Sequence, residues 1–364
     1  MASTEVEIPK QHKACVYDEP GKVSTKVEML DTPEPGPGEV LVNLTHSGVC
    51  HSDFGVMTNS WAGLPYPTSK GQVGGHEGVG KVVKLGPGAE ESGLKIGDRV
   101  GIKWVQKICG SCLACLEGAD GVCFSAKVSG YYSPGTFQQY IVSPANYATP
   151  IPDGLSSESA APMLCAGITT YAALRKSGAR AGQWVVISGA GGGLGHLACQ
   201  IASRGMALRV IGLDHGSKKD LALQSGAEHF FDVFAHDDAS LAEEIKKVTG
   251  GLGASAVVVC TASNKAYAQA LDFLRFGGTL VCVGMPEGKP VAIEKAYPAA
   301  MVFKELNIRA SAVGNRRDAV ECLEMAARGV VKTHYRLEKM EKLTEVFQDM
   351  EQGKLTGRVV LDLQ

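Results

Sequence analysis

The chain has 364 residues, 45% of them hydrophobic, and this length favours roughly two domains with a sizeable core. Its 36 lysines and arginines nearly balance 38 aspartates and glutamates, which argues against nucleic acid or an anionic membrane as a partner. The expected partners are a small molecule and other copies of the chain. No apolar run has the length of a signal peptide or a transmembrane helix, so we expect a soluble protein of the cytoplasm.

Short β-prone runs broken by glycine and proline fill the first 150 residues, and the clearest are residues 39–49, 78–86 and 98–104. From about Cys165 apolar strands alternate with helix-length segments, which is typical of a parallel sheet built from βαβ units. The predicted strands there are residues 183–189, 208–214, 254–261 and 278–284, and the predicted helices are residues 194–205, 240–250 and 264–278. The sequence therefore predicts an α/β protein with a β-rich domain and a doubly wound domain. A final β-prone segment, GRVVLDLQ, could return to the first domain.

A glycine-rich segment, ISGAGGGLGHL, follows one of these strands and opens a helix. Bare backbone amides at a helix N-terminus can hold a pyrophosphate, as in dinucleotide-binding folds. The match to G-x-G-x-x-G is imperfect, because the register that ends at Gly195 places Ala190 at the first glycine; a longer turn that begins at Gly189 is the other register. The candidate cofactor-binding residues of the turn are Gly189, Gly191, Gly192, Gly193, Leu194 and Gly195.

Asp214 lies nineteen residues after Gly195, at the end of the next predicted strand. A carboxylate there accepts hydrogen bonds from the adenosine ribose and would repel a 2′-phosphate, so we expect NAD and not NADP. Lys219 could reach the same ribose, and the adjacent Lys218 is an alternative for that role. The competing interpretation of the whole segment is a glycine-rich turn without a ligand.

Four cysteines with the spacing C-x2-C-x2-C-x7-C lie in residues 109–123. Four thiolates on a short, turn-rich segment suit a closed tetrahedral zinc site, so Cys109, Cys112, Cys115 and Cys123 are the candidate ligands of a structural zinc. An iron–sulfur cluster is the main alternative, but no C-x3-C-P run follows. Four unrelated core cysteines are the other alternative. Disulfides are not expected in a reducing compartment.

A second group of metal-seeking residues is spread along the chain. GVCHSD contains Cys50, His51, Ser52 and Asp53, GGHEG contains His76 and Glu77, and Cys165 lies at the expected domain junction. A single histidine in a β-rich segment is more often a core residue than a ligand, but here other candidate ligands accompany it.

These motifs resemble the zinc-containing medium-chain alcohol dehydrogenases. Residues 75–89 match the signature G-H-E-x2-G-x5-G-x2-A, and the resemblance covers nearly the whole chain. The motifs GVCHSD, VGGHEG, GIKW, SGYYSPGTFQQY, LCAGIT, SGAGGGLG, VGMP, VGNR and GRVV occur in the order found in the yeast-type, tetrameric branch. The resemblance implies a GroES-like catalytic domain over residues 1–166, a Rossmann NAD-binding domain over residues 167–312, and a return to the catalytic domain over residues 313–364.

The resemblance also implies a ligand set for a catalytic zinc. Cys50, His76 and Cys165 would bind the ion, and water or a substrate oxygen would take the fourth position. Glu77 is a candidate exchanging ligand, and Asp53 would hold the second ring nitrogen of the bound imidazole. The alternative for Asp53 is a turn-capping aspartate. With the four-cysteine site, this gives two zinc ions per subunit.

By the same resemblance, Ser52 would pass the alcohol proton through the nicotinamide ribose to His51. His51 would also contact the pyrophosphate, as would Arg358; the alternatives are a surface histidine and an exposed, salt-bridging arginine. Val283 and Met285, which follow the last predicted strand, are expected beside the cofactor.

Trp61, Trp104 and Met285 would narrow the substrate pocket, unless the tryptophans simply fill the core. Narrow walls favour short primary alcohols, so we expect an NAD-dependent zinc alcohol dehydrogenase that acts as a homotetramer. The alternatives are a dehydrogenase for secondary, branched or aromatic alcohols, and a catalytically silent relative with a binding or structural role.

Overall fold

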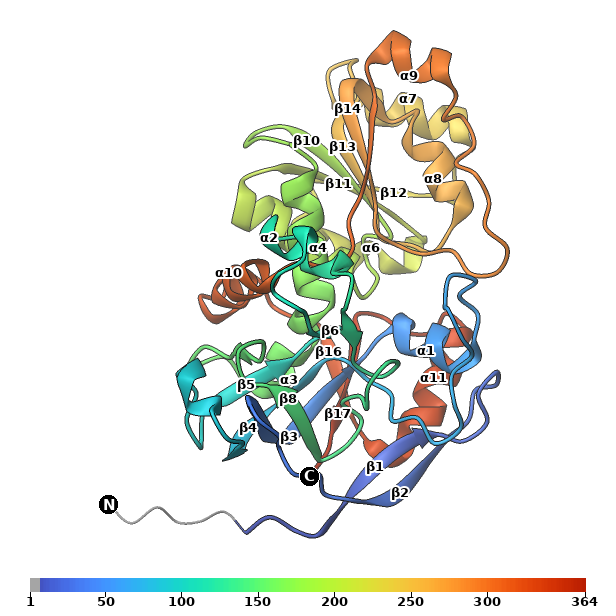
Figure 1. Cartoon of the computed structure of the whole chain (residues 1–364). Coiled ribbons are helices and arrows are strands. Elements are labelled where there is room, and N and C mark those ends of the chain that lie inside the picture. Colours follow the sequence, from blue (N-terminus) through green and yellow to red (C-terminus); the bar gives the residue numbers. More distant parts are fainter. Residues whose placement is uncertain (1–6) are drawn as a thin grey trace.

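The computed structural model describes residues 7–364 and contains two main sheets, one in each half of the molecule (Figure 1). The first sheet has seven strands in the order β16-β17-β3-β4-β5-β9, with β8 paired to β3. Its strands are β3 (Glu39–Val49), β4 (Gly78–Leu85), β5 (Arg99–Ile102), β8 (Tyr140–Pro144), β9 (Thr149–Pro150), β16 (Tyr335–Lys339) and β17 (Arg358–Asp362). The C-terminal strand β17 pairs antiparallel with β3, so the end of the chain lies in the sheet built by its beginning.

Two small sheets and four α-helices complete this half. The small sheets are β1 (Gln11–Tyr17) with β2 (Thr25–Asp31), and β6 (Val105–Lys107) with β7 (Lys127–Val128). The helices are α1 (His51–Thr58), α2 (Leu113–Leu116), α3 (Ser157–Ala160) and α11 (Leu343–Glu351).

The second sheet is parallel throughout, with the order β12-β11-β10-β13-β14-β15. Numbered from its own first strand this is 3-2-1-4-5-6, the order of the doubly wound dinucleotide-binding fold. The strands are β10 (Trp184–Ser188), β11 (Arg209–Asp214), β12 (His229–Asp232), β13 (Ala254–Val259), β14 (Leu274–Cys282) and β15 (Asn307–Ala310). The order reverses between β10 and β13, and ligands of such sheets bind at the carboxyl ends of the strands on either side of that point.

Helices lie on both faces of this sheet. They are α4 (Ala166–Lys176), α5 (Gly195–Gln200), α6 (Lys219–Gln224), α7 (Asp238–Val248), α8 (Asn264–Ala270), α9 (Pro298–Lys304) and α10 (Arg316–Ala327). A π-helical turn over Ile201–Gly205 continues α5. The short 3-10 turns of the chain are Ala89–Ser92, Asp120–Val122, Ala161–Leu164, Gly216–Lys218 and Met340–Lys342.

One predicted helix is shorter than the sequence indicated. The prediction ran from 264 to 278, but α8 ends at Ala270 and the chain enters β14 at Leu274. Phe273 and Leu274 are buried, and Leu274 pairs with Ala254 of β13. Because a buried strand of a parallel sheet is apolar on both faces, its first residues continued the helical pattern without a visible break.

The hydrophobic core is continuous across the junction of the two halves. One cluster joins the helices α4, α5 and α10 and the strand β10 to Val79 of β4 and Val360 of β17. A second cluster fills the β-rich half, and a third packs α7 and α8 on the other face of the parallel sheet. Apolar side chains from both halves therefore pack against each other at the junction, and this packing holds the elements that carry the candidate site in place.

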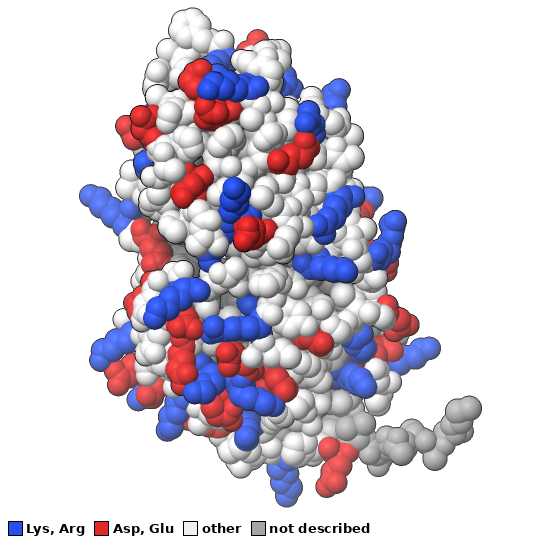
Figure 2. Space-filling model, turned by 180° about the vertical axis from the view of Figure 1, so that it is seen from behind, with Lys and Arg blue, Asp and Glu red and all other residues white. Residues whose placement is uncertain are grey.

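The surface carries both signs of charge. On the face shown in Figure 2, lysine and arginine side chains intermix with aspartate and glutamate, in agreement with the near-neutral net charge. Among residues 7–364, no helix has the length and apolarity needed to cross a membrane.

Phe347 of α11 packs against α1, the helix that follows the candidate metal ligand Cys50. It is fully buried, with its ring centroid 6.3 Å from that of Phe54 in α1 and 6.4 Å from that of Phe137. Phe347→Ala should lower the free energy of unfolding by about 3–5 kcal/mol, because the cavity left between these rings cannot fully collapse. Urea titration measures the loss. Leu337→Ala, at a half-exposed position of β16, is the control, and equal midpoints for the two variants would contradict the packing described here.

Candidate metal centres and nucleotide cleft

Three separate segments bring the candidate catalytic ligands together at the junction. Cys50 precedes α1, His76 and Glu77 precede β4, and Cys165 precedes α4. One ligand atom from each of these four residues lies within 4.8 Å of all the others, and all four residues are buried. The Sγ atoms of Cys50 and Cys165 are 4.0 Å apart, close to the roughly 3.8 Å expected for two thiolates on one tetrahedral zinc.

Asp53 orients the histidine of this cluster. Its Oδ1 lies 2.8 Å from Nδ1 of His76, and its Oδ2 accepts a hydrogen bond of 2.9 Å from the backbone N–H of Cys50. The carboxylate of Asp53 therefore has both predicted roles: it bonds to the His76 imidazole, and it caps the turn that begins at Cys50. Because Nδ1 bonds to Asp53, Nε2 is the ring nitrogen that is left for another ligand, and it is buried without a hydrogen-bond partner among residues 7–364. A buried ring nitrogen of this kind fits a metal ion.

The two thiols of this cluster differ in their environment. The pKa of Cys50 lies well below its ordinary value, because the Cys165 thiol donates a hydrogen bond to its sulfur and the charges of Arg358 and His76 stabilise the thiolate against the effect of burial. The pKa of Cys165 lies well above its ordinary value, because its thiol donates that hydrogen bond and is buried. Thiolates are the form in which cysteine binds metals. The donor set of two sulfurs and one imidazole nitrogen thus fits zinc with an open position.

Arg358 forms a buried ion pair with Glu77. Its Nη2 donates to Oε1 of Glu77, and the arginine is only 5% exposed, so the alternative of an exposed arginine does not hold. Burial raises the pKa of the Glu77 carboxyl to about 7, although the nearby guanidinium opposes this shift. A Cβ added to Gly193 would lie 3.0 Å from Cδ of Arg358. The arginine thus connects the cysteine–histidine cluster to the glycine-rich turn.

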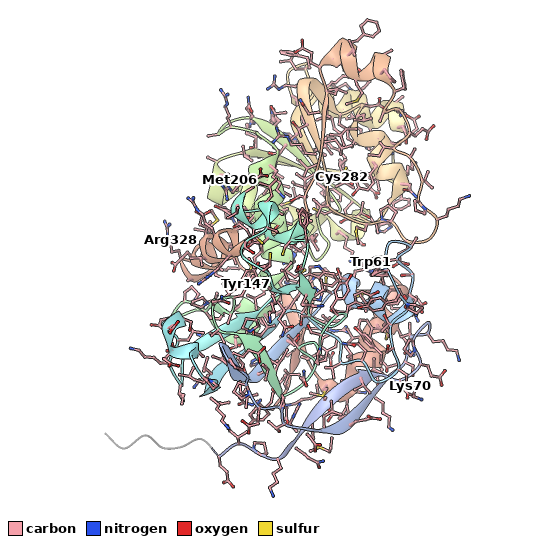
Figure 3. All side chains as sticks on the ribbon, viewed as in Figure 1. Trp61, Lys70, Tyr147, Met206, Cys282 and Arg328 are labelled. Atoms are coloured by element: carbon pink, nitrogen blue, oxygen red, sulfur yellow. The ribbon has the colours of Figure 1, made fainter. Side chains whose placement is uncertain are left out.

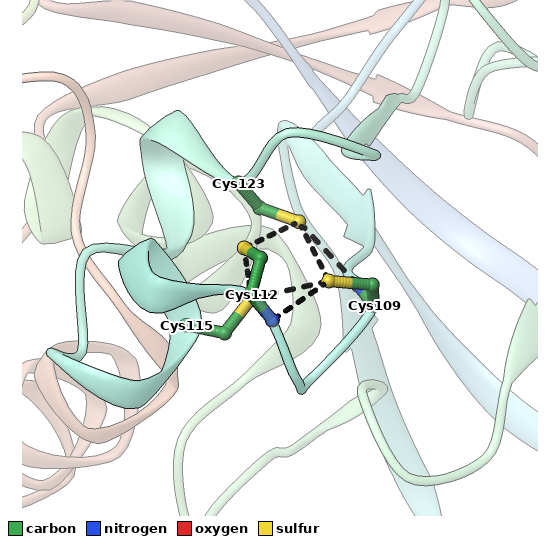
Figure 4. A group of neighbouring side chains, drawn as sticks. All are labelled: Cys109, Cys112, Cys115 and Cys123. Carbon is green, nitrogen blue, oxygen red and sulfur yellow. Dashed lines mark hydrogen bonds between the residues drawn. The ribbon is translucent and has the colours of Figure 1, made fainter.

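The four-cysteine group is a second, separate cluster (Figure 4). The Sγ distances between Cys112 and Cys115 and between Cys123 and Cys109 are 3.5 and 3.6 Å. Backbone amides donate to the sulfurs, and those of Ser111 and Cys112 lower the pKa of Cys109 to about 6. Four sulfurs that face one another, with backbone hydrogen bonds that favour the thiolate at Cys109 and Cys112, fit a closed zinc site, and the alternative of four unrelated core cysteines does not hold.

The glycine-rich turn uses the longer of the two registers. Gly189 has a φ of +83°, and a Cβ on Gly195 would lie 1.9 Å from the carbonyl oxygen of Gly189. A Cβ on Gly191 would lie 2.5 Å from Cβ of Lys218. Glycine is therefore required at these three positions, while Ala190 is tolerated as a buried core residue. Leu194 directly precedes α5.

Asp214 ends β11 beside this turn. Its Oδ2 accepts a hydrogen bond of 2.9 Å from the backbone N–H of Gly191, which holds the carboxylate at the edge of the cleft. Lys218 lines the cleft, and its Nζ donates to Oγ1 of Thr356 at 2.9 Å. Lys219 is exposed on the first turn of α6 and does not line the cleft.

A cavity of about 560 Å³ lies between the two halves and receives groups from both. The predicted residues that line it are Cys50, His51, Ser52, Trp61, Trp104, Cys165, Gly189, Gly192, Gly193, Leu194, Asp214, Val283, Met285 and Arg358. Two sulfur ligands and the glycine turn therefore open into one space. Trp104 packs edge-on against the His76 ring, with centroids 4.8 Å apart, and against Trp61 at 6.1 Å. The tryptophans form a wall of the cavity, so they do more than fill the core.

Sequence reasoning missed several lining residues. Thr169 of α4 has a buried hydroxyl without a hydrogen-bond partner among residues 7–364, and it lines the cavity near Cys165. Gly121, from the lobe of the four cysteines, and the segment 311–313 also reach the cavity. The motif LCAGITT contained a signal for Thr169, but the contribution of the lobe follows only from its packing against Ala312.

A β-rich half joined to a dinucleotide-type sheet, with a cysteine–histidine cluster at their seam, defines the class of zinc-binding dehydrogenases. Residues 36–153 match the alcohol dehydrogenase GroES-like domain and residues 193–328 match the zinc-binding dehydrogenase domain. The chain belongs to the zinc-containing alcohol dehydrogenase family.

Relatives and solved structures agree with this assignment. The chain is 66% identical over 362 residues to "Alcohol dehydrogenase 2" of Emericella nidulans, covering 98% of this chain and 99% of that one. It is 42% identical to an alcohol dehydrogenase of Schizosaccharomyces pombe, over 97% and 98% of the two chains. An alcohol dehydrogenase from Aeropyrum pernix has a similar structure, with a TM-score of 0.85 and 29% identity over 96% and 99% of the chains. The predicted family, fold class, enzymatic function and zinc and nicotinamide cofactors are confirmed at the level of the family.

His196 of α5 ties the glycine turn to the β-rich half. It is fully buried, its Nε2 accepts a hydrogen bond of 3.1 Å from the N–H of His334, and its Nδ1 therefore donates to the carbonyl of Gly192 at 2.9 Å. Burial lowers the pKa of this imidazole from 6.5 to about 4. The neutral ring is thus part of the folded state.

Because the unfolded chain binds the His196 proton at higher pH than the folded chain, folding should lose stability as pH falls from 6.5 towards 4. His196→Gln, whose side chain can both accept and donate, should reduce this loss. Urea midpoints measured across that range test the expectation, with the exposed His229→Gln as control. The same acid slope in His196→Gln and the parent protein would show that this ring is not responsible.

Proposed function

We propose that the chain interconverts short primary alcohols and aldehydes, with NAD as hydride acceptor. The observation that carries the proposal is the opening of Cys50 and Cys165 into the same cavity as the glycine turn. Hydride transfer requires the reacting carbon and the nicotinamide to meet in a water-poor space, and this cavity is the place where the two candidate sites meet.

Cys50, His76 and Cys165 would hold the catalytic zinc, with Glu77 as a candidate exchanging ligand. Bound zinc supplies Lewis acidity, which lowers the pKa of an alcohol as it does that of water. Asp53 keeps the His76 ring in the tautomer that presents Nε2. Ser52 lies within 3.7 Å of the Cys50 sulfur, and its hydroxyl can both accept and donate a proton. His51 stands at the mouth of the cavity, where it can exchange a proton with solvent.

For the cofactor, we propose that the amides of residues 189–195 face the pyrophosphate and that Asp214 accepts from the adenosine ribose. Lys219 is the lysine that its position after Asp214 suggests for that ribose, although Lys218 is the one that lines the cleft. Val283 and Met285 would lie beside the nicotinamide, and Arg358 and His51 near the phosphates. Trp61, Trp104 and Met285 would limit the length of the alcohol.

The remaining proposals concern organisation. We place the catalytic domain at residues 1–166 and 313–364 and the nucleotide domain at residues 167–312, with a structural zinc in the lobe 109–123. The resemblance suggests a homotetramer, and we place the protein in the cytoplasm; light scattering and cell fractionation test these two points.

Turnover of alcohols is the direct test of the function. With NAD present, NADH absorbance should rise most efficiently with ethanol, and less efficiently with propan-2-ol and benzyl alcohol. Treatment with a chelator should remove nearly all of the rate, and added zinc should restore it. A higher kcat/KM for propan-2-ol or benzyl alcohol would instead assign the enzyme to secondary or aromatic alcohols, and a rate that survives complete removal of the metal would exclude the proposed mechanism.

The two clusters should respond differently to the loss of one thiol. Cys165→Ser should abolish turnover and leave the fold intact, because it removes a ligand beside the reacting oxygen. Cys112→Ser should mainly lower the unfolding temperature, because a closed site contributes to folding. Cys282→Ser, outside both clusters, is the control. Turnover and zinc content are measured for each variant, and parent-like turnover of Cys165→Ser would overturn the ligand assignment.

A further inference from the structure

A short loop crosses the mouth of the cleft from the nucleotide half to the catalytic half. Residues 285–288, here called the clasp loop, follow β14 and descend to the segment after α1 (Figure 1). Oε1 of Glu287 lies 2.8 Å from Nε2 of His51. The N–H of Gly288 donates to the carbonyl of Ser60 at 3.1 Å, and Gly288 forms a parallel β-bridge with Trp61.

Two of the residues that the clasp loop contacts, His51 and Trp61, belong to the candidate active site. His51 begins α1 next to Cys50, and Trp61 is a wall of the cavity. In Figure 3, Trp61 lies where the two halves meet. Its ring packs on Gly55, where a Cβ would lie 2.8 Å from Cε2, so the ring cannot move deeper into the catalytic half. Trp61 is therefore held from both sides: Gly288 of the nucleotide half contacts its backbone, and Gly55 of the catalytic half supports its ring.

We propose that the clasp loop holds Trp61 in the wall of the substrate pocket when the two halves close, and that Glu287 is a positioning residue for His51. This inference rests on the proposed function, since it concerns the pocket and the histidine of that reaction. The cavity takes lining from both halves, so contacts that cross its mouth oppose the separation of the halves and slow the release of a bound dinucleotide. The clasp loop makes such contacts with His51 and Ser60, and the hydrogen bond of Lys218 to Thr356 is another.

The contact between Glu287 and His51 lies at the surface, and because water screens exposed charges, its strength is limited. The side chains of His51 and Glu287 are 48% and 33% exposed. Exposed charged pairs change an equilibrium by roughly two- to fivefold, and the loss of this pair should change nucleotide release by about that factor. The backbone bond of Gly288 is a second, independent part of the clasp. Gly288 has a φ of +74° and open space around its Cα, so alanine there would strain the turn without a steric clash.

The experiment measures NADH release and alcohol kinetics in variants of the clasp loop. Glu287→Ala should accelerate the dissociation of NADH, followed by stopped-flow fluorescence, by about two- to fivefold and raise the KM for ethanol, with an unchanged unfolding temperature. Glu287→Gln should lie between Glu287→Ala and the parent, because its oxygen can still accept from Nε2–H of His51. Lys289→Ala is the matched control, because this exposed neighbour makes no hydrogen bond or ion pair within residues 7–364.

Gly288→Ala tests whether a change in NADH release comes from the contacts of the clasp loop or only from the charge of Glu287. Removal of the Glu287 carboxylate alone could alter the attraction between the cleft and the phosphates, and in that case Glu287→Gln and Glu287→Ala would change equally while Gly288→Ala would not. Faster NADH release in both Glu287→Ala and Gly288→Ala supports the clasp. The proposal would be overturned if Glu287→Ala and Gly288→Ala released NADH at the same rate as Lys289→Ala. It would also be overturned if Glu287→Gln and Glu287→Ala changed the rate equally while Gly288→Ala did not. NADH release needs no alcohol turnover, so a parent that binds NADH but oxidises no alcohol would refute the proposed function and leave the clasp comparison valid.

Discussion

The carboxylate of Asp53 holds together two groups that lie 26 residues apart, the backbone N–H of Cys50 and the ring nitrogen Nδ1 of His76. The first bond begins α1 and directs the Cys50 side chain towards the junction. The second orients the ring of His76 and leaves Nε2 buried without a hydrogen-bond partner among residues 7–364. A carboxylate, a thiol and an imidazole would be costly to bury separately, and they are tolerated here because each satisfies another. The rest of the candidate site is arranged around this contact.

Arg358 extends this arrangement from the cysteine–histidine cluster to the nucleotide turn. It reaches the cluster because β17 returns to pair with β3, so a residue near the end of the chain lies beside one near its beginning. Its guanidinium pairs with Glu77, and its aliphatic part packs on Gly193. A buried arginine supplies positive charge where two thiols, a carboxyl group and the proposed pyrophosphate approach one another. The two halves are thus linked electrostatically as well as by their shared apolar core.

The predictions from sequence were most reliable where one residue type has one physical use. Four cysteines within 15 residues indicated their own cluster, and the glycine-rich segment indicated a turn that does not tolerate larger side chains at Gly189, Gly191 and Gly195. Boundaries were less reliable. The helix predicted to extend to residue 278 ends at Ala270. The prediction was wrong because buried apolar residues such as Phe273 and Leu274 suit a helix and a buried strand equally well. The turn register was also open, because only the distance between Gly195 and the carbonyl of Gly189 distinguishes the two possibilities.

By itself, the sequence determined the order of sheet and helix, the composition of the four-cysteine cluster and the position of the dinucleotide turn, because periodicity, the spacing of ligands and glycine requirements are local properties. The tertiary structure decided which distant side chains meet: Arg358 with Glu77, the four-cysteine lobe with the cleft, Lys218 in place of Lys219 at the cleft wall, and Glu287 with His51. Contacts of this kind depend on how the two halves pack against each other, and no short-range pattern in the chain encodes that packing.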